Sequence, residues 1–92
     1  MQSSEKISLD TRTFPEIFQS LEPYWRNELR IKMTLRMRIS EVTFYNWAKG
    51  AARPQSYSSQ KEASAIIKSV LKLNVHPAYL FSKGETTNTT IQ

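Results

Sequence analysis

Residues 30–49 read RIKMTLRMRISEVTFYNWAK, and this stretch decides the interpretation of the chain. Residues that are common in helices continue up to Met37, and a short non-helical turn is expected after it. Ser40 is then well suited to cap a further helix over Glu41–Lys49. Gly50 stands where a left-handed residue commonly ends a helix. The stretch therefore predicts two helices joined by a tight turn.

Apolar residues occupy the positions at which two such helices must lock together at a steep angle. They are Met33 and Met37 on the first helix, Ile39 in the turn, and Phe44 and Trp47 on the second helix. Thr34 is small enough for the two backbones to approach each other. This arrangement predicts a helix-turn-helix whose second helix, Glu41–Lys49, is the recognition helix.

The segment from Ile39 to Gly50 carries the signature I-S-x-x-T-F-Y-N-W-x-x-G. It resembles the phage-repressor and Cro-like helix-turn-helix family, and the likeness extends from Arg30 to about Pro54. The resemblance implies sequence-specific binding of double-stranded DNA by a transcriptional regulator of phage or mobile-element type. The family usually has glycine where Arg38 stands, and arginine in a left-handed turn costs about 1 kcal/mol. Either the turn is reshaped, or Arg38 accepts this strain because it serves the binding surface.

The net charge of +5 lies in one central segment. Its basic residues are Arg26, Arg30, Lys32, Arg36, Arg38, Lys49 and Arg53, against the two acids Glu28 and Glu41. The remainder of the chain has six basic and six acidic residues and is neutral. Such a cluster is typical of a protein that binds a polyanion. The alternative is an ordinary solvated helix face.

Helical geometry divides the recognition helix into two faces, with Phe44, Trp47 and Ala48 pointing inward. The outward residues that we predict to face DNA bases are Val42, Tyr45, Asn46 and Lys49. The residues that we predict to contact phosphates are Lys32, Arg36, Arg38, Ser40, Thr43 and Arg53. Three of these residues have simpler interpretations. Tyr45 would be a half-buried packing residue, Asn46 a solvated one, and Lys49 a complement to the helix C-terminus.

The chain outside this stretch also reads as helical. A capping box over Thr13–Glu16 starts a first helix, and Pro23–Met37 forms a second. A box over Ser59–Glu62 starts a regular amphipathic helix that Asn74 would cap at its end, and Pro77–Phe81 forms a short last one. No segment shows the alternation of a strand. We predict an all-α bundle of four to five helices over residues 11–83, between flexible segments 1–10 and 84–92.

Several apolar residues are expected to complete the core. Trp25 and the methionines are predicted to be buried, and the last helix is predicted to fold Tyr79, Leu80 and Phe81 back onto the core. Ile31 and Leu35 lie on another side of the second helix. A helix that is apolar on two sides is usually packed by more than one neighbour. We therefore expect Pro23–Met37 to be the central helix.

The composition argues against several classes of function. There is no cysteine, and His76 is the sole histidine, so no metal site is expected and His76 is predicted to cap a turn. No nucleophile–base pair or glycine-rich phosphate loop is visible, so the chain is predicted not to be an enzyme and to need no cofactor or small-molecule ligand. No apolar run approaches the length of a membrane span, and the sequence is predicted to be cytoplasmic.

Two alternatives and one further expectation remain open. A helical protein-interaction adaptor without nucleic-acid binding is the main rival to DNA binding. RNA binding is a weaker rival, because the aromatic residues fall mostly on inferred core faces. We also predict a homodimer on DNA through the region around Val70–Phe81, since related proteins often pair on palindromic sites.

Overall fold

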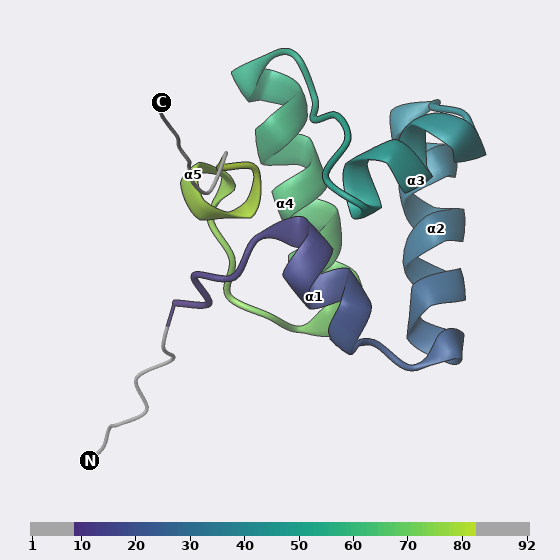
Figure 1. The fold of residues 1–92 in the computed structure, drawn as a ribbon, viewed down its shortest axis with the longest axis horizontal. Coiled ribbons are helices and arrows are strands. Elements are labelled where there is room, and N and C mark those ends of the chain that lie inside the picture. The colour runs from purple at the N-terminus through teal and green to yellow at the C-terminus, as the bar shows by residue number, and fades with distance from the viewer. Residues whose placement is uncertain (1–8, 83–92) are drawn as a thin grey trace.

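The computed structural model describes residues 9–82, and five helices build this part of the chain (Figure 1). They are α1 (Phe14–Ser20), α2 (Pro23–Met37), α3 (Glu41–Ala48), α4 (Tyr57–Leu71) and α5 (Pro77–Leu80). Within these residues the only strand-like pairing is an isolated bridge between Asp10 and Val75. The predicted all-α bundle is therefore confirmed. The predicted flexible segments fall almost entirely on residues 1–8 and 84–92, which lie outside the described residues.

The first two helices begin where local signals predict. The Thr13 hydroxyl accepts a hydrogen bond from the Glu16 amide, and the Glu16 carboxylate accepts one from the Thr13 amide at 2.8 Å. This reciprocal pair is the capping box that the sequence predicts. Pro23 opens α2 at a position where its missing amide hydrogen costs nothing. Both starts are therefore fixed by a few adjacent residues.

The core is assembled around aromatic rings from α1, α3 and the end of α5. Phe14 has no exposed surface, and its ring contacts three other phenylalanine rings edge to face. α4 packs along α2, and the two helices together supply most of the aliphatic part of the core. The buried aliphatic side chains include Leu29, Met33, Ala63, Ile66 and Ile67. In Figure 1, α3 crosses the upper end of α2, and α5 lies beside α4 on the opposite side of the molecule.

The end of α1 is held by an arginine from the next helix. Nε of Arg26 donates to the carbonyl of Phe18 at 3.1 Å, and Nη2 donates to that of Gln19 at 3.0 Å. The guanidinium also lies 5.3 Å from the centre of the Phe18 ring. Free carbonyls at a helix C-terminus attract cations. Arg26 is thus a structural member of the central basic segment.

The N-terminal end of the described chain is tied to the loop before α5. The Asp10 amide donates to the Asn74 carbonyl at 2.7 Å, so Asp10 is anchored although it ends the segment predicted to be flexible. Hydrogen bonds from Arg12 lower the pKa of the Asp10 carboxyl, against the opposing effect of partial burial. Asp10 therefore stays ionised while it holds Arg12.

The predicted caps of α4 are wrong at both ends. α4 begins at Tyr57 and not after Ser59, because the hydroxyl of Ser56 accepts the hydrogen bond from the Ser59 amide at 3.0 Å. The run of serines offers more than one cap, and the earlier one adds a turn. At the other end Lys72 is the cap, with a left-handed backbone at φ 60°, so Asn74 does not cap this helix.

α2 packs against two neighbours, α3 and α4, as predicted, but neither of them covers its second apolar side. Ile31 and Leu35 are 40% and 72% exposed, and Trp25, which we predicted to be buried, is 41% exposed. α2 turns one face, with Leu29 and Met33, toward the core. Trp25 lies near the N-terminal end of α2, at the edge of that face. Tyr79, predicted to fold back with the buried Leu80 and Phe81, is 43% exposed.

Candidate nucleic-acid interface

A three-residue turn, Arg38-Ile39-Ser40, joins α2 to α3. Arg38 has φ 57° and ψ 46°, the left-handed conformation that glycine adopts most easily. Its amide and that of Ile39 both donate to the carbonyl of Thr34, at 3.2 Å for Ile39. Of the two alternatives for this position, the turn is not reshaped and Arg38 takes the strained conformation. Ile39 packs against the core, as predicted.

The two helices on either side of the turn are also joined by side chains. Nη1 of Arg30 in α2 is 2.7 Å from a carboxylate oxygen of Glu41, the first residue of α3. The buried side chains Met33 and Phe44 belong to the same core. Thr34 turns its hydroxyl onto the Arg30 carbonyl at 2.7 Å, so its polar group is satisfied within α2. The sequence analysis did not foresee the Arg30–Glu41 ion pair.

The two ends of α3 are capped in different ways. At the start, the Ser40 hydroxyl accepts a hydrogen bond from the Thr43 amide at 3.0 Å and contacts the Thr43 hydroxyl at 3.1 Å. At the end, Gly50 has φ 82°, and the amide of Ala51 donates to the Asn46 carbonyl at 2.8 Å. The Gly50 amide donates to the Trp47 carbonyl, which completes a Schellman motif. The predicted caps of α3 are confirmed.

The predicted division of α3 into two faces agrees with the burial of its side chains. Phe44, Trp47 and Ala48 are buried. On the opposite face, Val42 is 71% exposed and Lys49 is exposed, with the half-buried Asn46 between them. Tyr45 is 44% exposed, and its ring packs edge to face on Phe44 at 5.2 Å. Its ring therefore rests on the core while part of its side chain faces solvent.

The central basic residues divide into engaged and unengaged groups. Arg26 and Arg30 are occupied within the fold as described above, and Arg53 donates to the carbonyl of Phe81 at 3.1 Å. The other four are Lys32, Arg36, Arg38 and Lys49, which are exposed and form no ion pair or side-chain hydrogen bond within residues 9–82. Within the central segment, the charge available to a ligand therefore lies on α2, the turn and the end of α3.

These four cations do not all lie on one side of α2. At about 100° per residue, Lys32 and Arg36 fall roughly opposite Arg30 and Thr34 around the helix axis. Arg30 is the residue that reaches α3. Arg38 and Lys49 border α3 itself, at its two ends. Arg38 and Lys49 thus flank α3 at its two ends, while Lys32 and Arg36 lie on the side of α2 away from Arg30.

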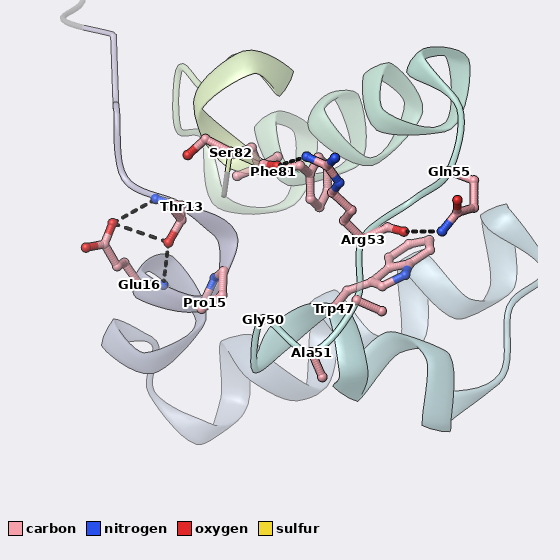
Figure 2. Close-up of a pocket in the computed structure, with 12 residues that line it drawn as sticks. Thr13, Pro15, Glu16, Trp47, Gly50, Ala51, Arg53, Gln55, Phe81 and Ser82 are labelled. Carbon is pink, nitrogen blue, oxygen red and sulfur yellow. Dashed lines mark hydrogen bonds between the residues drawn. The ribbon is translucent and has the colours of Figure 1, made fainter. Parts of the chain in front are cut away.

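Arg53 borders a concavity of about 760 Å³ between the N-terminus of α1, the loop after α3 and the end of α5. Figure 2 shows its guanidinium reaching to the main chain at Phe81, with Trp47 and Gly50 on the α3 side and Pro15 on the α1 side. Pro15 Cγ would lie 3.3 Å from a Cβ atom at Gly50. Arg53 therefore joins the loop to α5, and its contact with phosphate stays a prediction.

Two features that would indicate other kinds of site are absent from the described part of the chain. Among residues 9–82 there is no cluster of three or more side chains able to hold a metal ion. None of the helices described is long and apolar enough to cross a membrane. His76 caps α5, where its Nδ1 accepts a hydrogen bond from the Ala78 amide at 3.0 Å, as predicted.

Comparison of the chain with protein-family models, with curated proteins and with solved structures found no match. The function therefore has to be argued from the residues and the geometry of α2, the turn and α3.

Proposed function

We propose that the chain binds double-stranded DNA sequence-specifically, with α2, the turn and α3 acting as a helix-turn-helix, as a cytoplasmic transcriptional regulator of phage or mobile-element type. One observation carries this proposal. The outward face of α3 presents Val42, Asn46 and Lys49, and an unpaired cation stands at each end of the helix, Arg38 before it and Lys49 after it. An α-helix with such a face fits the major groove of B-DNA.

The position and charge of Arg38 support the same proposal. Its left-handed backbone ends α2 just as that of Lys72 ends α4, so the support comes from where the side chain stands. The side chain is exposed, directly before the N-terminus of α3, and makes no ion pair among the described residues. A cation at this point would lie next to the phosphate that a helix N-terminus attracts.

The roles of the remaining residues follow from their positions. The Asn46 amide can donate to and accept from an adenine edge together, and Val42 can contact a thymine methyl group. The Ser40 hydroxyl donates to the Thr43 hydroxyl, so Thr43 can donate its own free proton to a phosphate, whereas Ser40 would first have to turn its proton away from Thr43. Tyr45 presents its exposed part at the flank of the helix.

The test is selection of duplexes from a random-sequence pool on the immobilised full-length chain. We expect a common sequence to be enriched, because the α3 face carries both hydrogen-bonding and apolar groups. Failure to enrich any sequence, together with no duplex binding at low salt, would reject the proposal. That result would favour the alternative of a protein-interaction adaptor.

Asn46→Ala is expected to cost about 1–3 kcal/mol of binding free energy on the selected duplex and to relax preference at one base pair. The half-buried Asn46 has no side-chain hydrogen bond among the described residues, so the loss should fall on DNA recognition and not on folding. Titration of the variant against the selected duplex and a scrambled one makes the measurement. Equal weakening on both duplexes would show that α3 is oriented differently.

Arg38→Gly is expected to stabilise the fold by about 1 kcal/mol, because glycine adopts the left-handed conformation without the Cβ clash. The same change should weaken binding to every duplex, since it removes a phosphate contact. Chemical unfolding and duplex titration on one sample measure both effects. Lys72→Gly is the matched control: it relieves the same kind of strain at the end of α4 and should leave duplex binding unchanged. If the Arg38→Gly variant binds duplexes as tightly as the original chain, Arg38 is not part of the interface.

A further inference from the structure

The region around Val70–Phe81, where we predicted pairing, exposes less apolar surface than α2 does, although Tyr79 is 43% exposed and Val70, Leu71 and Leu73 are only partly buried. In the region around Val70–Phe81, the side chains of Val75, Leu80 and Phe81 are buried in the chain's own core. The larger surplus of apolar surface lies on α2, where Tyr24, Ile31 and Leu35 are 62%, 40% and 72% exposed.

These side chains belong to one line along the outer side of α2, which we call the outer stripe. Its members within α2 are Tyr24, Glu28, Ile31 and Leu35, and Arg38 follows as the C-cap residue just beyond the helix. They are separated alternately by four and three residues, the spacing of the contact positions in a coiled coil. At about 100° per residue the four helical members fall within about 60° of one another, on the side of α2 away from the buried Met33.

The charges of the outer stripe are arranged to complement a second copy of it. Glu28 precedes the Ile31–Leu35 pair and Arg38 follows it, and neither forms an ion pair within residues 9–82. In an antiparallel pair of helices, one register packs Ile31 of each copy beside Leu35 of the other. The same register sets Glu28 of each copy opposite Arg38 of the other. A parallel pair would instead set Glu28 against Glu28.

We propose that the outer stripe is a self-association surface, on which a second copy of this chain packs its α2 antiparallel to the first. The same residues meet on both copies, as two-fold symmetry requires. A helix of 15 residues is about 22 Å long, so the interface is small and the dimer is weak. The proposal goes beyond the proposed function, because the dimer forms without DNA.

Sedimentation equilibrium of the full chain without DNA tests the proposal. The apparent mass is expected to rise from 10.7 kDa toward twice that value as the protein concentration is raised through the micromolar range. Leu35→Glu should weaken the dimer about tenfold or more, because it sets a charge in the apolar centre. Tyr57→Glu, at a 58% exposed position on α4, is the matched control and should leave the dimer unchanged. A monomer at every concentration, or equal weakening by both variants, overturns the proposal.

A charge exchange tests the antiparallel register. Glu28→Arg alone and Arg38→Glu alone should each weaken the dimer, since each sets like charges opposite one another. The double variant should restore the dissociation constant to within about threefold of the original. Circular dichroism of each variant checks that the helices are retained. Two folded single variants with no restoration in the double variant would reject the antiparallel arrangement.

Discussion

Replacing Phe14 with alanine is expected to lower the free energy of unfolding by about 3–5 kcal/mol, the usual range for a fully buried aromatic residue. The Phe14 side chain has no exposed surface. Its ring centroid lies 6.2 Å from that of Phe18, 5.9 Å from that of Phe44 and 6.1 Å from that of Phe81. These rings come from α1, α3 and the end of α5, so one substitution loosens the packing between three elements.

Urea unfolding followed by circular dichroism measures this effect. Tyr57→Ala serves as the control, because it also removes an aromatic ring, from a side chain that is 58% exposed. The control should change the free energy of unfolding by less than about 1 kcal/mol. Similar unfolding midpoints for both variants would show that Phe14 is not the centre of the core.

The parts of the fold that the sequence predicted correctly are governed by neighbouring residues. The capping box at Thr13, the serine cap at Ser40 and the left-handed Gly50 each depend on contacts within about one helical turn. The inward face of α3 follows from helical periodicity alone. Local signals of this kind are readable from a single sequence.

Competing local signals and the arrangement of the helices account for the errors. Ser56 and Ser59 are both good caps, and nothing in their immediate neighbours shows which one starts α4. Trp25 follows the spacing of the core residues on α2, yet it lies near one end of the helix, where less of the bundle covers it. Hydrophobicity indicated which residues prefer burial, while the packing of α4 on α2 decided which of them are covered.

In the candidate interface, too, local features were predicted correctly and long-range contacts were not. The exposure of Val42 and Lys49 followed from the helix period, but the partners of the basic residues did not. Arg26 is engaged at the end of α1 and Arg30 pairs with Glu41 across the turn. These contacts join residues seven or more positions apart, which no short sequence pattern encodes. Counting basic residues therefore overestimated the charge free to meet a polyanion.

Binding to duplexes of unrelated sequence is expected to weaken about a hundredfold when the salt concentration is raised fourfold, if all four unengaged cations meet phosphates. Each such contact releases condensed counterions and contributes a slope of about 0.9 to the dependence of log affinity on log salt concentration. The four are Lys32, Arg36, Arg38 and Lys49. If only the two that border α3 take part, the same change in salt should weaken binding about tenfold.

Binding isotherms at several salt concentrations, repeated on single variants, decide between these two cases. Arg38→Ala and Lys49→Ala should each reduce the salt slope by about one unit. Arg36→Ala should do the same only if DNA also meets the side of α2 that points away from Arg30. Lys61→Ala is the matched control, because Lys61 is exposed on α4 and outside the central segment. A slope near zero in the unmodified chain would contradict binding through phosphates, because contacts with a polyanion release counterions whatever the base sequence.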